Sequence, residues 1–160
     1  MIVVLVGVTG SGKSTVGELL ARQLAWRFFD GDDFHSPDNI EKLRRGVALD
    51  DEDREPWLKA IRECISAMIE RSANAVIACS ALKHSYRRML QVSNEVVFIY
   101  LKADLALVRE RMKKRTGHFM NPGLVSSQFN TLEESEDALP IDASLPPAEI
   151  VRQIRHQLGI

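Results

Sequence analysis

The chain has 160 residues, a length typical of one domain, and it can bury a hydrophobic core without disulfide bonds or a structural metal. Its 21 basic and 22 acidic residues nearly balance, so charge gives no reason to expect nucleic acid or an anionic membrane as a partner. No apolar run approaches the roughly 20 residues that span a bilayer, and the short apolar start lacks the flanking features of a signal peptide. We therefore expect one domain over residues 1–160, located in the cytoplasm.

Strand-like and helix-like segments alternate along the chain. Short apolar runs predict strands at 2–6, 26–29, 75–79, 96–101 and 139–142. Apolar residues at helical spacing predict helices at 13–24, from 37 to a stop at Gly46, after Pro56, near 105–112 and over 147–158. This alternation predicts an α/β fold, with a parallel sheet between two layers of helices.

Two stretches, about 30–53 and about 115–137, show no clear periodicity. Long irregular stretches inside a compact domain are usually functional loops or lids. We therefore expect residues 115–137 to form a mobile lid, and we call this stretch the lid segment.

The first expected strand runs into Gly7-Val8-Thr9-Gly10-Ser11-Gly12-Lys13-Ser14, which matches the phosphate-loop pattern G-x-x-x-x-G-K-[ST] at every fixed position. In such a loop the backbone N–H groups and a helix N-terminus surround a phosphate, the lysine reaches the β- and γ-phosphates, and the hydroxyl ligates Mg²⁺. The sequence therefore predicts ATP with Mg²⁺ as the ligand. The residues expected to bind it are Gly7, Thr9, Gly10, Ser11, Gly12, Lys13, Ser14 and Thr15. No N-K-x-D guanine-reading motif follows, so a GTPase switch is disfavoured.

Carboxylates follow the second expected strand directly. In an open parallel sheet, ligand sites form at the carboxyl ends of strands, and phosphoryl transfer needs carboxylates for the metal and for the acceptor hydroxyl. We expect Asp30 to support Mg²⁺, through a water, and Asp32 to contact the acceptor hydroxyl from the same side of an extended segment. The alternative is that both are turn or capping residues, as Asp-Gly pairs often are.

Five blocks of the sequence resemble the gluconate kinases and occur in the same order. They are 30–43, 46–58, 79–87, the short Phe-Ile-Tyr-Leu block at 98–101, and 115–133, of which Asp-Arg-x-Pro-Trp-Leu at 53–58 and Cys-Ser-Ala-Leu-Lys at 79–83 are the most discriminating. The resemblance implies a P-loop fold of the nucleoside-monophosphate-kinase kind, related to shikimate kinase, with a five-stranded parallel sheet. It also implies phosphorylation of D-gluconate by ATP with Mg²⁺, and a homodimer.

A small anionic polyol such as gluconate needs cations for its carboxylate and hydrogen-bonding groups for its hydroxyls. We expect Arg54, Lys83 and Arg87 to be substrate contacts, the last two at i and i+4 on one face of a helix after Ser80. A solvated helix face is the alternative for Lys83 and Arg87. His35 either binds a substrate hydroxyl or serves as a capping or packing residue.

Arg111 and Arg115 are also spaced i and i+4, on the helix that enters the lid segment. A closing segment excludes water and can bring a cation to the transferring phosphoryl group, so we expect both arginines to contact the nucleotide and to act in catalysis. A pair of surface charges is the alternative. By resemblance, His118 and Gln128 face the substrate. Two other functions stay open: another small-molecule kinase of this fold, for shikimate or a nucleotide, and a nucleotide-binding regulator without catalysis.

Overall fold

The computed structural model describes residues 1–114, 117, 120–134 and 137–160. Its centre is a parallel sheet of five strands in the order β2-β3-β1-β4-β5. The strands are β1 (Ile2–Val6), β2 (Arg27–Asp30), β3 (Ala75–Ala78), β4 (Val96–Lys102) and β5 (Leu139–Asp142). The predicted α/β fold with a five-stranded parallel sheet is confirmed.

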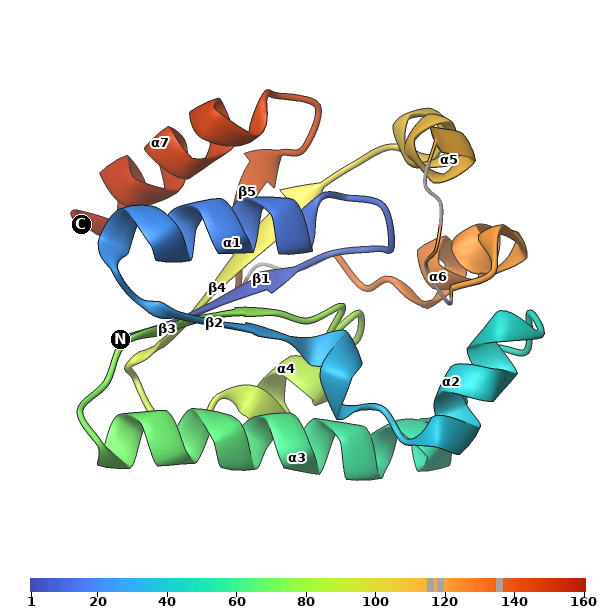
Figure 1. Cartoon of the computed structure of the whole chain (residues 1–160), viewed down its shortest axis with the longest axis horizontal. Coiled ribbons are helices and arrows are strands. Elements are labelled where there is room, and N and C mark those ends of the chain that lie inside the picture. The colour runs from blue at the N-terminus through green and yellow to red at the C-terminus, as the bar shows by residue number, and fades with distance from the viewer. Residues whose placement is uncertain (115–116, 118–119, 135–136) are drawn as a thin grey trace.

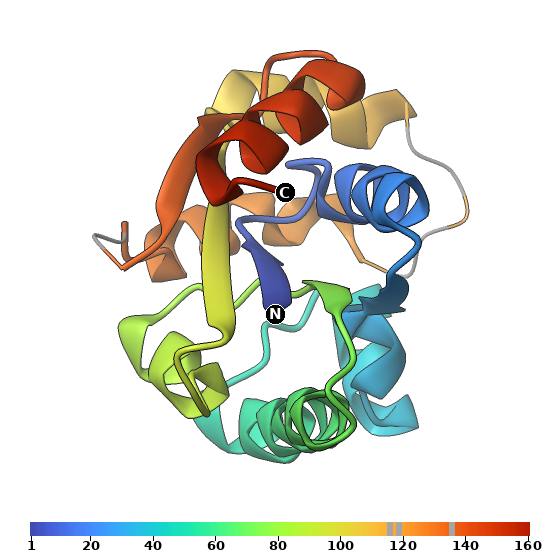
Figure 2. The same cartoon turned by 90° about the vertical axis from the view of Figure 1, so that its left-hand side faces the viewer.

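Helices cover both faces of the sheet and one of its ends (Figure 1). They are α1 (Lys13–Leu24), α2 (Pro37–Arg44), α3 (Asp51–Glu70), α4 (His84–Leu90), α5 (Leu105–Lys114), α6 (Val125–Thr131) and α7 (Pro147–Leu158), with 3₁₀ turns η1 (Gly31–Phe34) and η2 (Pro122–Leu124). Helices α1 and α7 lie on one face and α3 and α4 on the other, as Figure 2 also shows. None of the helices in the described part of the chain is both long and apolar enough to cross a membrane.

Strand β1 explains why the sheet needs helices on both faces. All five of its residues are buried, and they divide between two apolar clusters. Val3 and Leu5 pack with residues of α1 and α7, whereas Val4 and Val6 pack with residues of α3. A continuous apolar run is the expected sequence of a strand covered on both sides.

Helix α3 begins earlier than the sequence predicted. We expected it after Pro56, but it starts at Asp51, with Asp50 as its N-cap. The Asp50 side chain accepts from the Asp53 N–H (2.8 Å), and the Asp53 side chain accepts from the Asp50 N–H (3.3 Å). This capping box satisfies the helix N-terminus, so Pro56 lies inside the helix and Arg54 in its first turns.

The two stretches without periodicity also contain helices. Within 30–53 the structure has η1, α2 and the start of α3, and the lid segment contains η2 and α6. Asn121 of the lid segment caps the end of α2, because its N–H donates to Leu43 O (3.2 Å) and its amide to Arg44 O (3.3 Å). Helix α2 is the helix predicted from residue 37, and that prediction is confirmed. The elements η1, η2 and α6 are short, which is why periodicity did not reveal them.

Candidate active site

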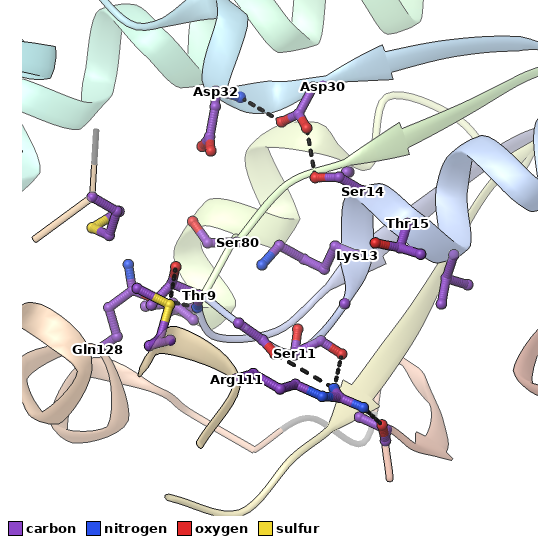
Figure 3. A pocket seen from close by; sticks show the side chains of 18 of the residues that line it. Thr9, Ser11, Lys13, Ser14, Thr15, Asp30, Asp32, Ser80, Arg111 and Gln128 are labelled. Carbon is purple, nitrogen blue, oxygen red and sulfur yellow. Dashed lines mark hydrogen bonds between the residues drawn. The ribbon is translucent and has the colours of Figure 1, made fainter. Parts of the chain in front are cut away.

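The carboxyl ends of the strands open into a pocket of ≈ 370 Å³. It is lined by the loop after β1, by η1, by the starts of α3 and α4, by α5 and α6, and by the β5–α7 loop (Figure 3). Of the residues predicted to form the site, those that line it are Thr9, Gly10, Ser11, Gly12, Lys13, Ser14, Thr15, Asp30, Asp32, His35, Arg54, Arg111 and Gln128. The predicted residues Arg115 and His118 lie outside the described residues.

The phosphate loop has the backbone that its glycines permit. Gly7, Gly10 and Gly12 have φ values of 143°, 74° and 100°, in the region that side chains rarely adopt. Gly7 does not line the pocket. A Cβ at this position would lie 2.9 Å from the Leu101 carbonyl oxygen, so Gly7 is required for the turn itself. Lys13 reaches back along the loop and donates from Nζ to Val8 O (2.8 Å).

Ser14 and Asp30 form a pair of oxygen ligands at the edge of the loop. The Ser14 hydroxyl donates to Asp30 Oδ2 (2.6 Å), and Asp30 Oδ1 accepts from the Asp32 N–H (3.0 Å), as Figure 3 shows. The segment is a 3₁₀ turn and not extended as predicted, because the Asp30 carboxylate caps it. Among the described residues no group of three or more acidic, His or Cys side chains could hold a metal alone. A hydroxyl and a carboxylate beside a phosphate site nevertheless suit Mg²⁺, which keeps several waters and binds phosphate oxygens.

His35 and Trp57 form one wall of the other end of the pocket. Their rings stack, with centroids 4.5 Å apart and an interplanar angle of 9°. Trp57 donates from Nε1 to Gly31 O (2.6 Å), which ties α3 to η1. Burial lowers the pKa of the His35 imidazole. The Asp32 charge opposes this shift by raising the pKa, and the Arg54 charge adds to it by lowering the pKa. His35 is therefore neutral near pH 7, and its buried Nδ1 has no hydrogen-bond partner among the described residues.

Arg54 reaches this wall from α3 and contacts Tyr86 of α4. Its Nη1 donates to the Tyr86 hydroxyl (3.1 Å), and the Tyr86 hydroxyl donates in turn to Asp51 Oδ1. Both Arg54 and Tyr86 line the pocket. Lys83 does not, because its Nζ is bonded to the Asp51 carboxylate at 2.7 and 2.9 Å. This pairing raises the pKa of Lys83 and, together with the Tyr86 hydroxyl, lowers the pKa of Asp51.

Arg87 does not line the pocket either. Its side chain is 1% exposed, and its guanidinium donates to Ala81 O (2.9 Å), Leu82 O (3.2 Å) and Glu133 O (3.1 Å). Its Nε also donates to Asp137 (3.2 Å). Lys83 is the N-cap of α4, so the expected common helix face for Lys83 and Arg87 is wrong. Arg87 instead joins the β3–α4 loop to the end of the lid segment.

Two side chains connect the phosphate loop to the elements around it. Arg111 donates from Nη1 to Ser11 O (3.1 Å) and from Nη2 to Ala143 O (2.7 Å), so it holds the β5–α7 loop against the phosphate loop (Figure 3). Gln128 of α6 accepts through Oε1 from the Thr9 N–H (2.6 Å). Helix α6 thus places an amide at one of the N–H groups that a phosphate would use.

Sequence reasoning missed part of the pocket. The apolar residues that line it near the nucleotide-binding loop are Met112, Ala143, Leu145, Pro147 and Ile150. They come from three elements and have no motif, so only the fold brings them together. Tyr86 stands inside a block noted for its family resemblance, but nothing in its spacing indicated a site residue. Trp57 both packs in the core and lines the pocket.

Known proteins resemble this chain over almost its whole length. The family model for shikimate kinase matches residues 9–158. The thermoresistant gluconokinase of Escherichia coli is 43% identical, with 94% of this chain and 89% of that protein aligned. Among solved structures, a sugar kinase from Janibacter is 39% identical with a TM-score of 0.92, covering 99% of this chain and 94% of its own. A gluconokinase from Sinorhizobium meliloti is 41% identical with a TM-score of 0.86, covering 98% and 90%.

The fold, the phosphate loop and these matches define a P-loop kinase that transfers a phosphoryl group from ATP to an alcohol. Within that class, the chain belongs to the gluconokinase family.

Proposed function

We propose that this chain phosphorylates D-gluconate, giving ADP and 6-phospho-D-gluconate. The proposal is based on how groups are arranged in one pocket: a phosphate loop lies at one end, and Asp32 and Arg54 lie at the other. Gluconate has its carboxylate at one end of its chain and a primary hydroxyl at the other. A site for it therefore needs both a cation and a proton acceptor, supplied from different elements.

The nucleotide end binds ATP through backbone and side-chain groups. The N–H groups of the loop and the N-terminus of α1 surround the phosphates, and Lys13 turns from Val8 O to their oxygens. Arg111 contacts the nucleotide from α5, and the apolar β5–α7 loop packs against the base. Arg115 is proposed for the same phosphates. Ser14 would ligate Mg²⁺ and Asp30 would support it through water, and the ion would supply positive charge beside the phosphates.

Asp32 acts on the acceptor hydroxyl. Its carboxylate points from η1 into the pocket, toward the loop that bears Lys13 (Figure 3). As the hydroxyl oxygen bonds to the γ-phosphorus, the bond from that phosphorus to the bridging oxygen breaks, and the hydroxyl proton passes to Asp32. By the family resemblance, Gln128, which accepts from the Thr9 N–H, and His118, which lies outside the described residues, are proposed to contact the acceptor, and exclusion of water would prevent hydrolysis of ATP.

Arg54 selects the acid. Of the pocket-lining cations in the described part of the chain, Lys13 and Arg111 stand at the nucleotide end, and Arg54 stands beside the His35–Trp57 wall. A guanidinium can donate two parallel hydrogen bonds to a carboxylate. His35, neutral and with Nδ1 unpartnered, binds a hydroxyl of the sugar acid. Lys83 and Arg87 are left out of the proposed contacts because neither lines the pocket.

The test is ADP production from Mg·ATP with gluconate, other sugar acids, shikimate and nucleoside monophosphates as acceptors. Gluconate should give turnover well above the others. A preference for shikimate or a nucleotide would leave the kinase class intact and overturn the acceptor, whereas ATP binding without turnover on any acceptor would indicate a regulator. The homodimer implied by the family resemblance stays a prediction, to be tested by light scattering of the purified chain.

A further inference from the structure

Two separate parts of the sequence meet beside the acceptor end of the pocket. Arg54 and Asp51 come from the first turns of α3, and Tyr86 and Lys83 come from the start of α4. Tyr86 is 5% exposed as a residue, whereas the Asp51 side chain is 66% exposed, so the hydroxyl forms its bonds at the edge of the buried region. Its hydroxyl lies between the Arg54 guanidinium and the Asp51 carboxylate.

The direction of each hydrogen bond in this cluster is fixed by chemistry. Asp51 is ionised and can only accept, so it accepts hydrogen bonds from the Tyr86 hydroxyl and from the Lys83 ammonium. Arg54 can only donate, so it must use a lone pair of the phenol oxygen. Burial raises the pKa of Tyr86, and the bond to Asp51 raises it further, so the phenol stays neutral. Asp51 therefore orients the phenol so that its lone pairs face Arg54.

The charges in this cluster show which of its cations is available to bind an acidic ligand. Lys83 and Asp51 form an ion pair, whereas Arg54 donates to a neutral phenol and interacts with the Asp51 and Asp53 charges only at longer range. The Arg54 guanidinium carbon and Lys83 Nζ lie 5.7 and 5.4 Å from the centroid of the Tyr86 ring, which also limits where the arginine can turn. An arginine held in this way loses less conformational entropy when it binds a carboxylate.

We infer that Tyr86 is a positioning residue that acts through Arg54, holding the guanidinium toward the carboxylate of the acceptor. Asp51 supports this role by accepting a hydrogen bond from the phenol hydroxyl. This inference rests on the proposed function, because it assumes an acidic acceptor. It adds to that function a residue pair that sets how tightly the acid is bound without touching the reacting atoms.

A double-mutant cycle on the full chain tests the inference. Tyr86→Phe keeps the ring and removes the hydroxyl. It should raise the KM for gluconate by roughly ten-fold, since a hydrogen bond to a charged group is lost, with little change in kcat or in the KM for ATP. In an Arg54→Ala background the same change should alter the gluconate KM less than about two-fold, because residues that act through each other are not additive. Tyr100→Phe removes a phenol hydroxyl from a buried site outside this pocket and should leave both constants unchanged.

The outcomes separate the two proposals. If the wild-type chain turns over gluconate but Tyr86→Phe raises the KM equally with and without Arg54, Tyr86 does not act through Arg54. A fall in kcat with an unchanged gluconate KM would give Tyr86 a different role. Asp51→Asn provides a second variant, expected to raise the gluconate KM less than Tyr86→Phe does; no change would remove Asp51 from the inference. If the wild-type chain does not turn over gluconate, both the proposed function and this inference fail.

Discussion

The two ends of the pocket are built in different ways. At the nucleotide end, residues 9–15 lie in one continuous segment, and their geometry follows from the local backbone of the glycines. At the acceptor end, the contacts come from η1, α3 and α4, and bonds such as Arg54 to Tyr86 and Trp57 to Gly31 join these elements. The nucleotide end depends on local conformation, whereas the acceptor end depends on how η1, α3 and α4 pack.

This difference has consequences for mutation. A change at the nucleotide end should act on every acceptor alike, because all of them need the same phosphates. A change at the acceptor end should act on the sugar acid first and leave ATP binding unchanged. The variants below test where the boundary between the two ends lies.

Asp32→Asn should have the largest effect, because Asp32 stands at that boundary. The amide keeps the shape of the side chain but cannot take the hydroxyl proton, and loss of a general base costs roughly 10²- to 10⁴-fold in kcat. Binding of a non-hydrolysable ATP analogue, measured by calorimetry, should be unchanged. Asp33→Asn is the matched control, since Asp33 is exposed in the same 3₁₀ turn. Near-normal turnover by Asp32→Asn would remove Asp32 from the mechanism.

Arg87→Leu should affect stability more than catalysis. It removes a buried guanidinium and leaves the buried carbonyls of Ala81 and Leu82 without that donor, at a cost of about 1–3 kcal/mol in the free energy of unfolding. Ala81 has φ 35°, an uncommon conformation outside glycine, and Arg87 helps to hold it.

Urea unfolding of Arg87→Leu and of Arg88→Ala, an exposed neighbour on α4, gives the comparison. Equal midpoints would contradict the structural role. A stable Arg87→Leu variant with a raised gluconate KM would return Arg87 to the acceptor site.

The same division between the two ends describes what the sequence could predict. The strands, the parallel sheet and the phosphate loop could be predicted because each depends on a local pattern: an apolar run, a helical period or a fixed spacing. Asp30 could be placed beside Ser14 because the carboxyl ends of parallel strands share one edge of the sheet.

The acceptor end could be predicted only in part, because its partners lie far apart in sequence. Arg54, Lys83 and Arg87 were all reasonable cations for an acid, and the sequence could not show which of them has a carboxylate or carbonyl partner. The Asp51 carboxylate pairs with Lys83, and the carbonyls of the β3–α4 loop accept hydrogen bonds from Arg87. Arg54 lines the pocket because the capping box starts α3 before it, which the Pro-Trp pair concealed.

Lys83→Ala distinguishes a direct contact from an indirect one. If Lys83 only pairs with Asp51, its loss should raise the gluconate KM by about two- to five-fold, since exposed ion pairs contribute little. Steady-state kinetics with gluconate and with ATP measure this effect. Lys59→Ala removes a comparable exposed partner, of Glu55 on α3, and should change neither constant. A rise of a hundred-fold would instead mean that Lys83 itself binds the acid.

The smallest expected effect is a pH dependence of stability at the His35–Trp57 wall. Burial lowers the pKa of His35 from its ordinary value of 6.5, so the folded chain binds fewer protons there than the unfolded chain does. Stability therefore rises with pH in that range, and it is lost as the pH falls from about 6.5 toward the folded-state pKa. His35→Gln should lose less stability than the wild-type chain between pH 7.5 and pH 5.5, because glutamine does not titrate.

Urea unfolding at both pH values measures this difference. His156→Gln, at an exposed position on α7, should keep the pH dependence of the wild-type chain. If His35→Gln also keeps it, His35 is not held neutral by the wall. If His35→Gln removes it, the ring is neutral in the folded chain, and Nδ1 donates to or accepts from a sugar hydroxyl according to its tautomer.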